Sequence, residues 1–271
     1  MKRIIIILLS AIITFTSCEL FEEASDGLST EEVVDGLKTA LKVGADTATT
    51  VLNQVDGYLK DEAVKILLPE EAQVIYEIRD NPLTADIYEA AIAPFVDNVI
   101  LTMNKAAENA ANEAKPILKN TITGMSINDA WDILNGTNPA DMSKAAGFDS
   151  TAATNYLVST TSEQLVVAYK DDIDQALGQD IIGNISAYDA WNTFKNSYNS
   201  IADNFLYNSA LTVAGIQLTP IEKELDQHVT EYALKGLFHK VGEEEVKIRR
   251  DPWEWASTLV GDILTKVFGD E

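Results

Sequence analysis

Apolar residues recur every three or four positions along most of the chain, which is the spacing of one face of an α-helix. The first such run follows Ser29-Thr30-Glu31-Glu32, where Ser29 and Glu32 have the spacing of a capping box at a helix N-terminus. Its apolar positions are Val33, Val34, Leu37, Leu41, Ala45, Ala48, Val51, Leu52 and Val55. The run predicts a long helix that stops at Asp56-Gly57, followed by a shorter helix over 61–68 that ends at Pro69.

The middle of the chain continues the helical pattern with proline interruptions. A helix is expected from Pro69 to about Ile78, and another over 83–114, kinked or broken near Ala93 because Pro94 lacks a backbone donor. Small residues line one side of its second half and predict a close helix–helix packing seam: Ala106, Ala107, Ala110, Ala111 and Ala114. Lys115-Pro116 predicts the end of that helix, with Pro116 at the first position of the next.

Two short segments share the form S-x-x-D-A-W-[DN]: Ser126 to Asp132, and Ser186 to Asn192. Each predicts a capped helix, the first of which closes at Asn135-Gly136. They could be two stacked helix hairpins, or capping chemistry that arose twice, and we favour the second because the echo spans only seven residues. Residues 137–150 read as a loop, with helices expected over 151–159, 162–177 and 184–199, and 201–218 ambiguous between helix and ordered loop.

The last third predicts two more helices. Thr219-Pro220-Ile221-Glu222 combines a cap, a proline at the first position and a glutamate, and predicts a long helix that runs to Arg250. Asp251-Pro252 ends it, and 253–268 forms a final amphipathic helix. Since no alternating strand pattern with hairpin turns is evident, we predict an all-α, multi-helix bundle with a long C-terminal helix and this final amphipathic helix.

The N-terminus reads as a targeting segment instead of part of the fold. Lys2 and Arg3 precede a short apolar run over 4–13, which is too short to span a bilayer but suits a signal peptide. Phe15-Thr16-Ser17-Cys18 resembles a lipobox, the site where bacterial lipoproteins are cleaved and acylated, and Cys18 is the only cysteine. We therefore expect a signal peptide at 1–17, a lipid-anchored tether at 18–28 and a single helical domain at 29–271.

The net charge of the chain limits the kinds of partner that it can bind. The chain has 271 residues, with 20 Lys and Arg against 43 Asp and Glu, so its net charge is −23, and removal of residues 1–17 would make it −25. Such a surface repels phosphates, which argues against nucleic acid and against a basic membrane-binding patch. The membrane is thus expected to be contacted only through acyl chains, more than one of which stable attachment requires. The expected location is the cell envelope, at the outer membrane facing the periplasm.

Few residues suggest chemistry, and we predict no catalytic set, metal site or cofactor. His228 and His239 lie eleven apart on one predicted helix, about 16 Å at ~1.5 Å per residue, so they cannot share a metal ion. His239 and Glu243 form an i, i+4 pair for which a surface role is favoured. The run Glu243 to Arg250 reads as a solvated helix face with pairs such as Glu245 with Arg249. A sharper hypothesis places a buried polar cluster on five side chains: Glu108, Glu113, Glu244, Arg249 and Asp251.

A family resemblance covers nearly all of the chain from Ser29 onward. Among the matching pieces are LSTEEVVDGLKTALKVG at 28–44, MNKAAENAANEAKPIL at 103–118, MSINDAWDILNG at 125–136 and VTEYALKGLFHKVGEEEVKIRRDP at 229–252. Through them the chain resembles the bacterial family of unknown function numbered 4197. The resemblance implies a helical, exported and often lipid-anchored protein, and it implies no activity.

Two functions fit these observations. The first, which we favour, is a lipid-anchored envelope protein that acts as a non-enzymatic interaction or envelope-support module with a protein partner. The second is a periplasmic binding protein or enzyme that binds a small ligand or metal through carboxylates and arginine of segments 103–136 and 229–252.

Overall fold

The protein is an elongated assembly of helices in a computed structural model that describes residues 29–72, 74–80, 89, 93–140, 148–205, 209 and 219–250. Its helices are α1 (Thr30–Leu52), η1 (Glu70–Ala72), α2 (Val74–Asp80), α4 (Ala93–Ala110), η3 (Ala111–Glu113), α5 (Ala114–Gly124), α6 (Ile127–Leu134), α7 (Ala152–Leu177), α8 (Ala187–Ala202) and α10 (Leu225–Arg250). Two short strands, β1 (Asp180–Ile182) and β2 (Ile185–Ser186), form an antiparallel hairpin. The all-α prediction is confirmed, with this hairpin as an addition.

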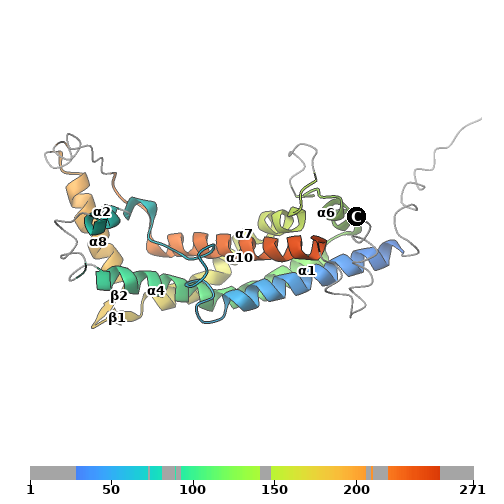
Figure 1. Cartoon of the computed structure of the whole chain (residues 1–271), viewed down its shortest axis with the longest axis horizontal. Helices are drawn as coiled ribbons and strands as arrows, with labels where there is room; N and C mark the ends of the chain where they lie inside the picture. The colour runs from blue at the N-terminus through green and yellow to red at the C-terminus, as the bar shows by residue number, and fades with distance from the viewer. Residues whose placement is uncertain are drawn as a thin grey trace, which may run out of the picture.

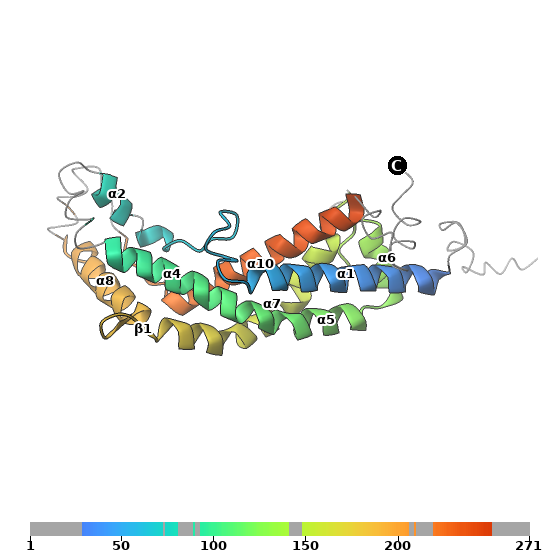
Figure 2. The ribbon, with the colours of Figure 1, turned by 60° about the horizontal axis from the view of Figure 1, so that its bottom comes forward.

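The long helices run along the body and the short elements gather at its ends (Figures 1 and 2). At one end, hereafter the α8 end, lie α2, α8, the hairpin and the start of α4. At the other, hereafter the α6 end, lie α6, the start of α1 and the last turns of α10. The predicted long C-terminal helix is α10, whereas the predicted final helix over 253–268, the signal peptide and the tether lie outside the described residues.

The predicted alanine seam is the centre of the core. The five alanines Ala106, Ala107, Ala110, Ala111 and Ala114 are all 0% exposed. They belong to a continuous rod made of α4, η3 and α5, which packs against both α1 and α7. Because a methyl group is the smallest side chain that fills such a contact, the seam lets the backbones approach closely.

The predicted helix end at Lys115-Pro116 is wrong in its detail. Pro116 is the third residue of α5, not the first, and the rod continues through the three-residue 3₁₀ segment η3. Proline cannot donate to the carbonyl of Asn112, and tightening to i→i+3 bonds one turn earlier absorbs that loss without ending the rod. Pro94, where a kink or break was expected, is the second residue of α4. Residues 90–92, which precede α4, lie outside the described residues.

The predicted helix over 61–68 is absent: residues 53–69 form an irregular segment, hereafter the 53–69 loop. Backbone hydrogen bonds of short turns satisfy part of this loop, and side chains of α4 bond further backbone groups. The amide of Asn104 accepts from Ile66 N–H at 2.9 Å and donates to the Ile66 carbonyl at 2.8 Å. Tyr58 is 0% exposed and donates to the Ala233 carbonyl at 2.8 Å, so the loop is packed against α10 as well.

The two helices predicted over 151–159 and 162–177 are one helix, α7. Four consecutive hydroxyl residues, Ser159 to Ser162, lie at the predicted break, and such side chains can compete for backbone groups. In α7 each hydroxyl instead donates to the carbonyl four residues earlier, at 2.6 to 2.9 Å. The hydrogen bonds stay within the helix, so the helix continues.

The Gly183-Asn184 pair makes the hairpin that the sequence reading missed, and residues 184–186 belong to it instead of to a helix. Gly183 has φ +61°, a left-handed conformation that glycine adopts without strain. Ser186 then caps α8 through Asp189, just as Ser126 caps α6 through Asp129. Since α6 and α8 lie at opposite ends of the body, the two S-x-x-D-A-W segments are not stacked hairpins (Figure 1).

The predicted start of the last long helix at Thr219 is also wrong, because α10 begins at Leu225. The side chain of Asn199 in α8 accepts from Ile221 N–H at 2.7 Å and donates to the Ile221 carbonyl at 2.9 Å. This pairing holds the backbone around Ile221 in a non-helical conformation, and it ties the segment before α10 to α8.

Candidate functional site

The polar residues that the sequence singled out are distributed over separate parts of the fold. Glu108, 6% exposed, accepts hydrogen bonds from the N–H groups of Tyr58 and Leu59, so it holds the 53–69 loop. Glu113 is exposed at the end of η3, and Asp251 lies outside the described residues. Glu244 pairs with Lys247 at 2.7 Å. These hydrogen bonds and ion pairs do not join Glu108 to Arg249.

Arg249 belongs instead to a buried cluster with Glu245, hereafter the Glu245 cluster. The two side chains are 8% and 3% exposed, and Arg249 Nη2 lies 2.8 Å from Glu245 Oε1. The same carboxylate accepts from the N–H groups of Ala153 and Thr154, at 3.0 and 2.8 Å, and from the Thr154 hydroxyl. Arg249 also donates to the Ile133 carbonyl at 2.8 Å, which ties α10 to α6.

The Glu245 cluster therefore serves the fold. A carboxylate at the N-terminus of α7 satisfies backbone donors that the helix itself leaves unpaired, and it interacts favourably with the helix dipole. The prediction that Glu245 lies on a solvated helix face is wrong, because its side chain is 3% exposed. The i, i+4 spacing of Glu245 and Arg249 in the sequence does not reveal that α7 begins beside them. Both oxygens are occupied, so the cluster offers no open ligand position.

The histidines do not build a site either. His239 lies 3.4 Å from Glu243, and both side chains are about half exposed. His228 is 2% exposed, and its Nε2 lies 2.8 Å from the Leu67 carbonyl of the 53–69 loop. Burial lowers the pKa of His228, against an opposing effect of that carbonyl. Burial also raises the pKa of Tyr58 well above its ordinary value.

Within the described ranges, no group of three or more His, Cys, Asp and Glu side chains is placed to hold a metal ion. Among the helices that the structure describes, none is long and apolar enough to cross a membrane.

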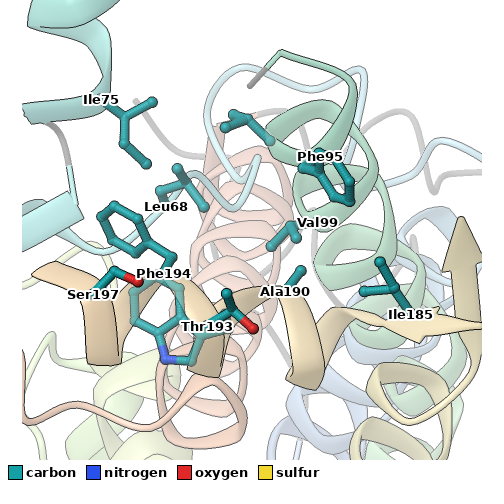
Figure 3. Close-up of a pocket in the computed structure, with 11 residues that line it drawn as sticks. Leu68, Ile75, Phe95, Val99, Ile185, Ala190, Thr193, Phe194 and Ser197 are labelled. Atoms are coloured by element: carbon teal, nitrogen blue, oxygen red, sulfur yellow. The ribbon is translucent and has the colours of Figure 1, made fainter. Parts of the chain in front are cut away.

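A different feature, which the sequence reading did not single out, is an apolar groove at the α8 end, hereafter the α4–α8 groove. Its volume is about 440 Å³. It is lined by Leu68, Ile75, Phe95, Val96, Val99, Ile185, Ala190, Trp191, Thr193, Phe194 and Ser197. In Figure 3, Ile75 and Leu68 lie toward one end of the groove and Phe95 and Ile185 toward the other, with Val99 and Ala190 facing each other between them.

The groove combines rigid walls with an exposed rim. Val96, Val99 and Trp191 are 6%, 5% and 2% exposed, so packing holds them in place, whereas Phe95 and Ile185 are 38% and 37% exposed. None of the described lining residues carries a charge, and their only side-chain oxygens are the hydroxyls of Thr193 and Ser197. The arrangement can bind an apolar group, but it contains no acid, base or nucleophile of ordinary reactivity.

The stretch of sequence that contains α8 has an unusual composition. Residues 183–219 contain three charged residues, Asp189, Lys195 and Asp203, in 37 positions, against 63 in 271 for the chain. Asp189 is bonded to Ser186, and Lys195 pairs with Glu224. A run of this composition could have been noticed from the sequence, because loss of charge with enrichment of aromatic residues marks the cores of contact surfaces.

Comparison with known proteins identifies the family but no function. The family model described as "Protein of unknown function (DUF4197)" matches residues 27–269, which confirms the resemblance drawn from the sequence. Searches of curated proteins and of solved structures found no match. The chain belongs to the DUF4197 family.

Proposed function

We propose that this member of the DUF4197 family is a lipid-anchored protein of the bacterial cell envelope whose body is a non-enzymatic binding module. The anchor would be Cys18, at the end of a signal peptide over 1–17, with residues 19–28 as the tether. The observation that carries the binding role is the α4–α8 groove, which offers an apolar, uncharged surface on otherwise acidic protein.

The positions of the start of α1 and of the groove support attachment at the α6 end and binding at the α8 end. The tether joins the body at the start of α1, in the α6 end (Figure 1). The 23 residues of α1 span about 34 Å at ~1.5 Å per residue, and the groove lies beyond its far end, alongside the first turns of α4. A protein anchored through Cys18 would therefore present the groove on the side of the body remote from its attachment.

The alternative of a carboxylate- and arginine-based ligand site has less support. Glu108 and Glu245 direct their oxygens to backbone N–H groups, and Arg249 is bound to Glu245 and to the Ile133 carbonyl. A ligand that used these groups would have to displace hydrogen bonds that hold helices together.

Anchoring is tested with Cys18→Ala in cells of a bacterium that carries the protein. We expect the unaltered chain to incorporate an alkyne-tagged fatty acid and to sediment with membranes, and the variant to do neither. Equal labelling of both proteins would contradict the anchor.

The binding role is tested separately, by a photoreactive residue placed at exposed Thr193 beside the groove or at exposed Asn120 on α5 near the α6 end. We expect discrete cross-linked products from position 193 and none in common from position 120. An identical pattern from both positions would contradict a binding surface at the α8 end.

A further inference from the structure

We propose that the α4–α8 groove binds one uncharged aliphatic chain, as found in a long-chain alcohol or a single-chain lipid with an uncharged head. This deepens the binding role proposed above by naming the ligand class, and it does not depend on the anchor at Cys18.

The size of the groove matches one chain. A volume of about 440 Å³ corresponds to roughly fifteen non-hydrogen atoms if each takes about 30 Å³, the share of a water molecule in the liquid. In Figure 3 the lining residues extend between α4 and α8 from Ile75 to Ile185, with Val99 and Ala190 between them. An unbranched chain fits this extended shape better than a fused ring system does.

The lining selects a hydrocarbon. Aliphatic and aromatic side chains make up the walls, and such surfaces gain free energy when they leave water together with another apolar surface. Since Val96, Val99 and Trp191 are nearly buried already, the walls are pre-formed, and binding would require little ordering of side chains.

The charges select an uncharged head. Burying an ionised group without a partner is costly, and no charged side chain is among the described lining residues. The chain as a whole is at −23, which would also repel a carboxylate or phosphate head. Thr193 and Ser197 lie four residues apart on α8, hence on one face, and both are exposed, so their hydroxyls can hydrogen-bond an alcohol or ester at the mouth.

The test uses tryptophan fluorescence, because Trp191 lines the groove. The protein is the chain from residue 18 with Cys18→Ser, which contains every described residue, and Trp131, Trp253 and Trp255 are changed to Phe so that Trp191 remains. The probe is 10-bromodecan-1-ol, whose bromine quenches a nearby indole. We expect saturable quenching by at least twofold, and the anion 10-bromodecanoate, above neutral pH, to bind at least tenfold more weakly.

Two groove variants and one control locate the effect. Ala190→Phe fills the middle of the groove and Ile185→Asp places a carboxylate at its rim, so each is expected to weaken the affinity for 10-bromodecan-1-ol at least tenfold. The control is Val167→Asp on α7, at a residue that is 75% exposed and outside the groove lining, where no change is expected. Circular dichroism shows whether each variant is folded.

Absence of quenching in the folded protein would overturn the proposal, as would quenching that both folded groove variants retain. Equal affinity for the alcohol and the carboxylate would overturn the selection of an uncharged head. If Thr193 cross-links to a protein in cells while the alcohol fails to quench Trp191, the aliphatic ligand is wrong and the proposed binding role stands.

Discussion

The two ends of the body differ in the polarity of their main feature: the α6 end contains a buried ion pair, and the α8 end contains an apolar groove. The α6 end contains buried charge, since Glu245 and Arg249 are 3% and 8% exposed, and the pair hydrogen-bonds α7 and α6 while Arg249 also lies over the ring of Phe148. At the α8 end, the described lining residues of the α4–α8 groove carry no charge and present apolar side chains. The buried charges at the α6 end therefore serve the fold, whereas the groove is the surface for which we propose binding.

The largest expected effect comes from breaking the Glu245 cluster. Glu245→Ala leaves Arg249 buried without its partner and frees two N–H groups at the start of α7, so we expect a loss of ~3–5 kcal/mol in the free energy of unfolding. Urea denaturation followed by circular dichroism measures it. The neighbouring Glu244→Gln is the matched control and should change stability little, because among the described residues the ion pair of Glu244 is with exposed Lys247. Equal losses in the two variants would show that the cluster has no special role.

The second effect concerns the 53–69 loop, which connects the two ends. Asn104→Ala removes both hydrogen bonds to the backbone of Ile66, and we expect a loss of about 1–3 kcal/mol because those groups become unsatisfied. Hydrogen exchange of the Ile66 amide should accelerate by the corresponding factor. Asn112→Ala, at an exposed position in the same rod, should leave that exchange rate unchanged.

Part of the fold could be predicted from the sequence. Helices whose signals are local, such as the capping boxes at Ser29 and Ser126, were predicted correctly, because the cap and the apolar stripe lie within a few residues of each other. The predicted core seam of alanines was correct for the same reason. A local sequence pattern predicts a helix correctly where the residues that stabilise the helix are close together in the sequence.

Several of the errors arise where a distant residue supplies the hydrogen bonds. The backbone of Ile66 in the 53–69 loop is bonded by Asn104, about 40 residues later, and that of Ile221 by Asn199. The carboxylate of Glu245 caps a helix that starts some 90 residues earlier in the chain. No spacing rule within one segment contains that information, and the groove, assembled from four separate segments, was missed for the same reason.

A smaller effect concerns pH. The pKa of buried His228 is lowered in the folded state, whereas in the unfolded chain it should be near 6.5. Below about pH 6.5 the unfolded chain therefore binds more protons at this site, so this contribution to stability is present above that pH and is lost as the pH falls toward the folded pKa. Comparing unfolding midpoints at several pH values for wild type and His228→Gln should show a shallower acid-side decline in the variant. A similar change in His239→Gln would contradict the assignment, because His239 is half exposed.

The smallest expected effect on stability is at the groove. Ile185→Asp changes a rim residue that is 37% exposed, and we expect the free energy of unfolding to change by less than about 1 kcal/mol. The same substitution should weaken binding of 10-bromodecan-1-ol at least tenfold. A variant that unfolded the α8 end would show that the rim is structural, and the contrast between the two ends would fail.

The most direct test of that contrast is a methyl NMR titration of the protein with 1-decanol. The account predicts saturable shifts in the methyl groups of Val99, Ile185, Leu68 and Ile75, which surround the groove. It predicts no shift at Ile133, beside the Glu245 cluster. Shifts at Ile133 with none in the groove would contradict it.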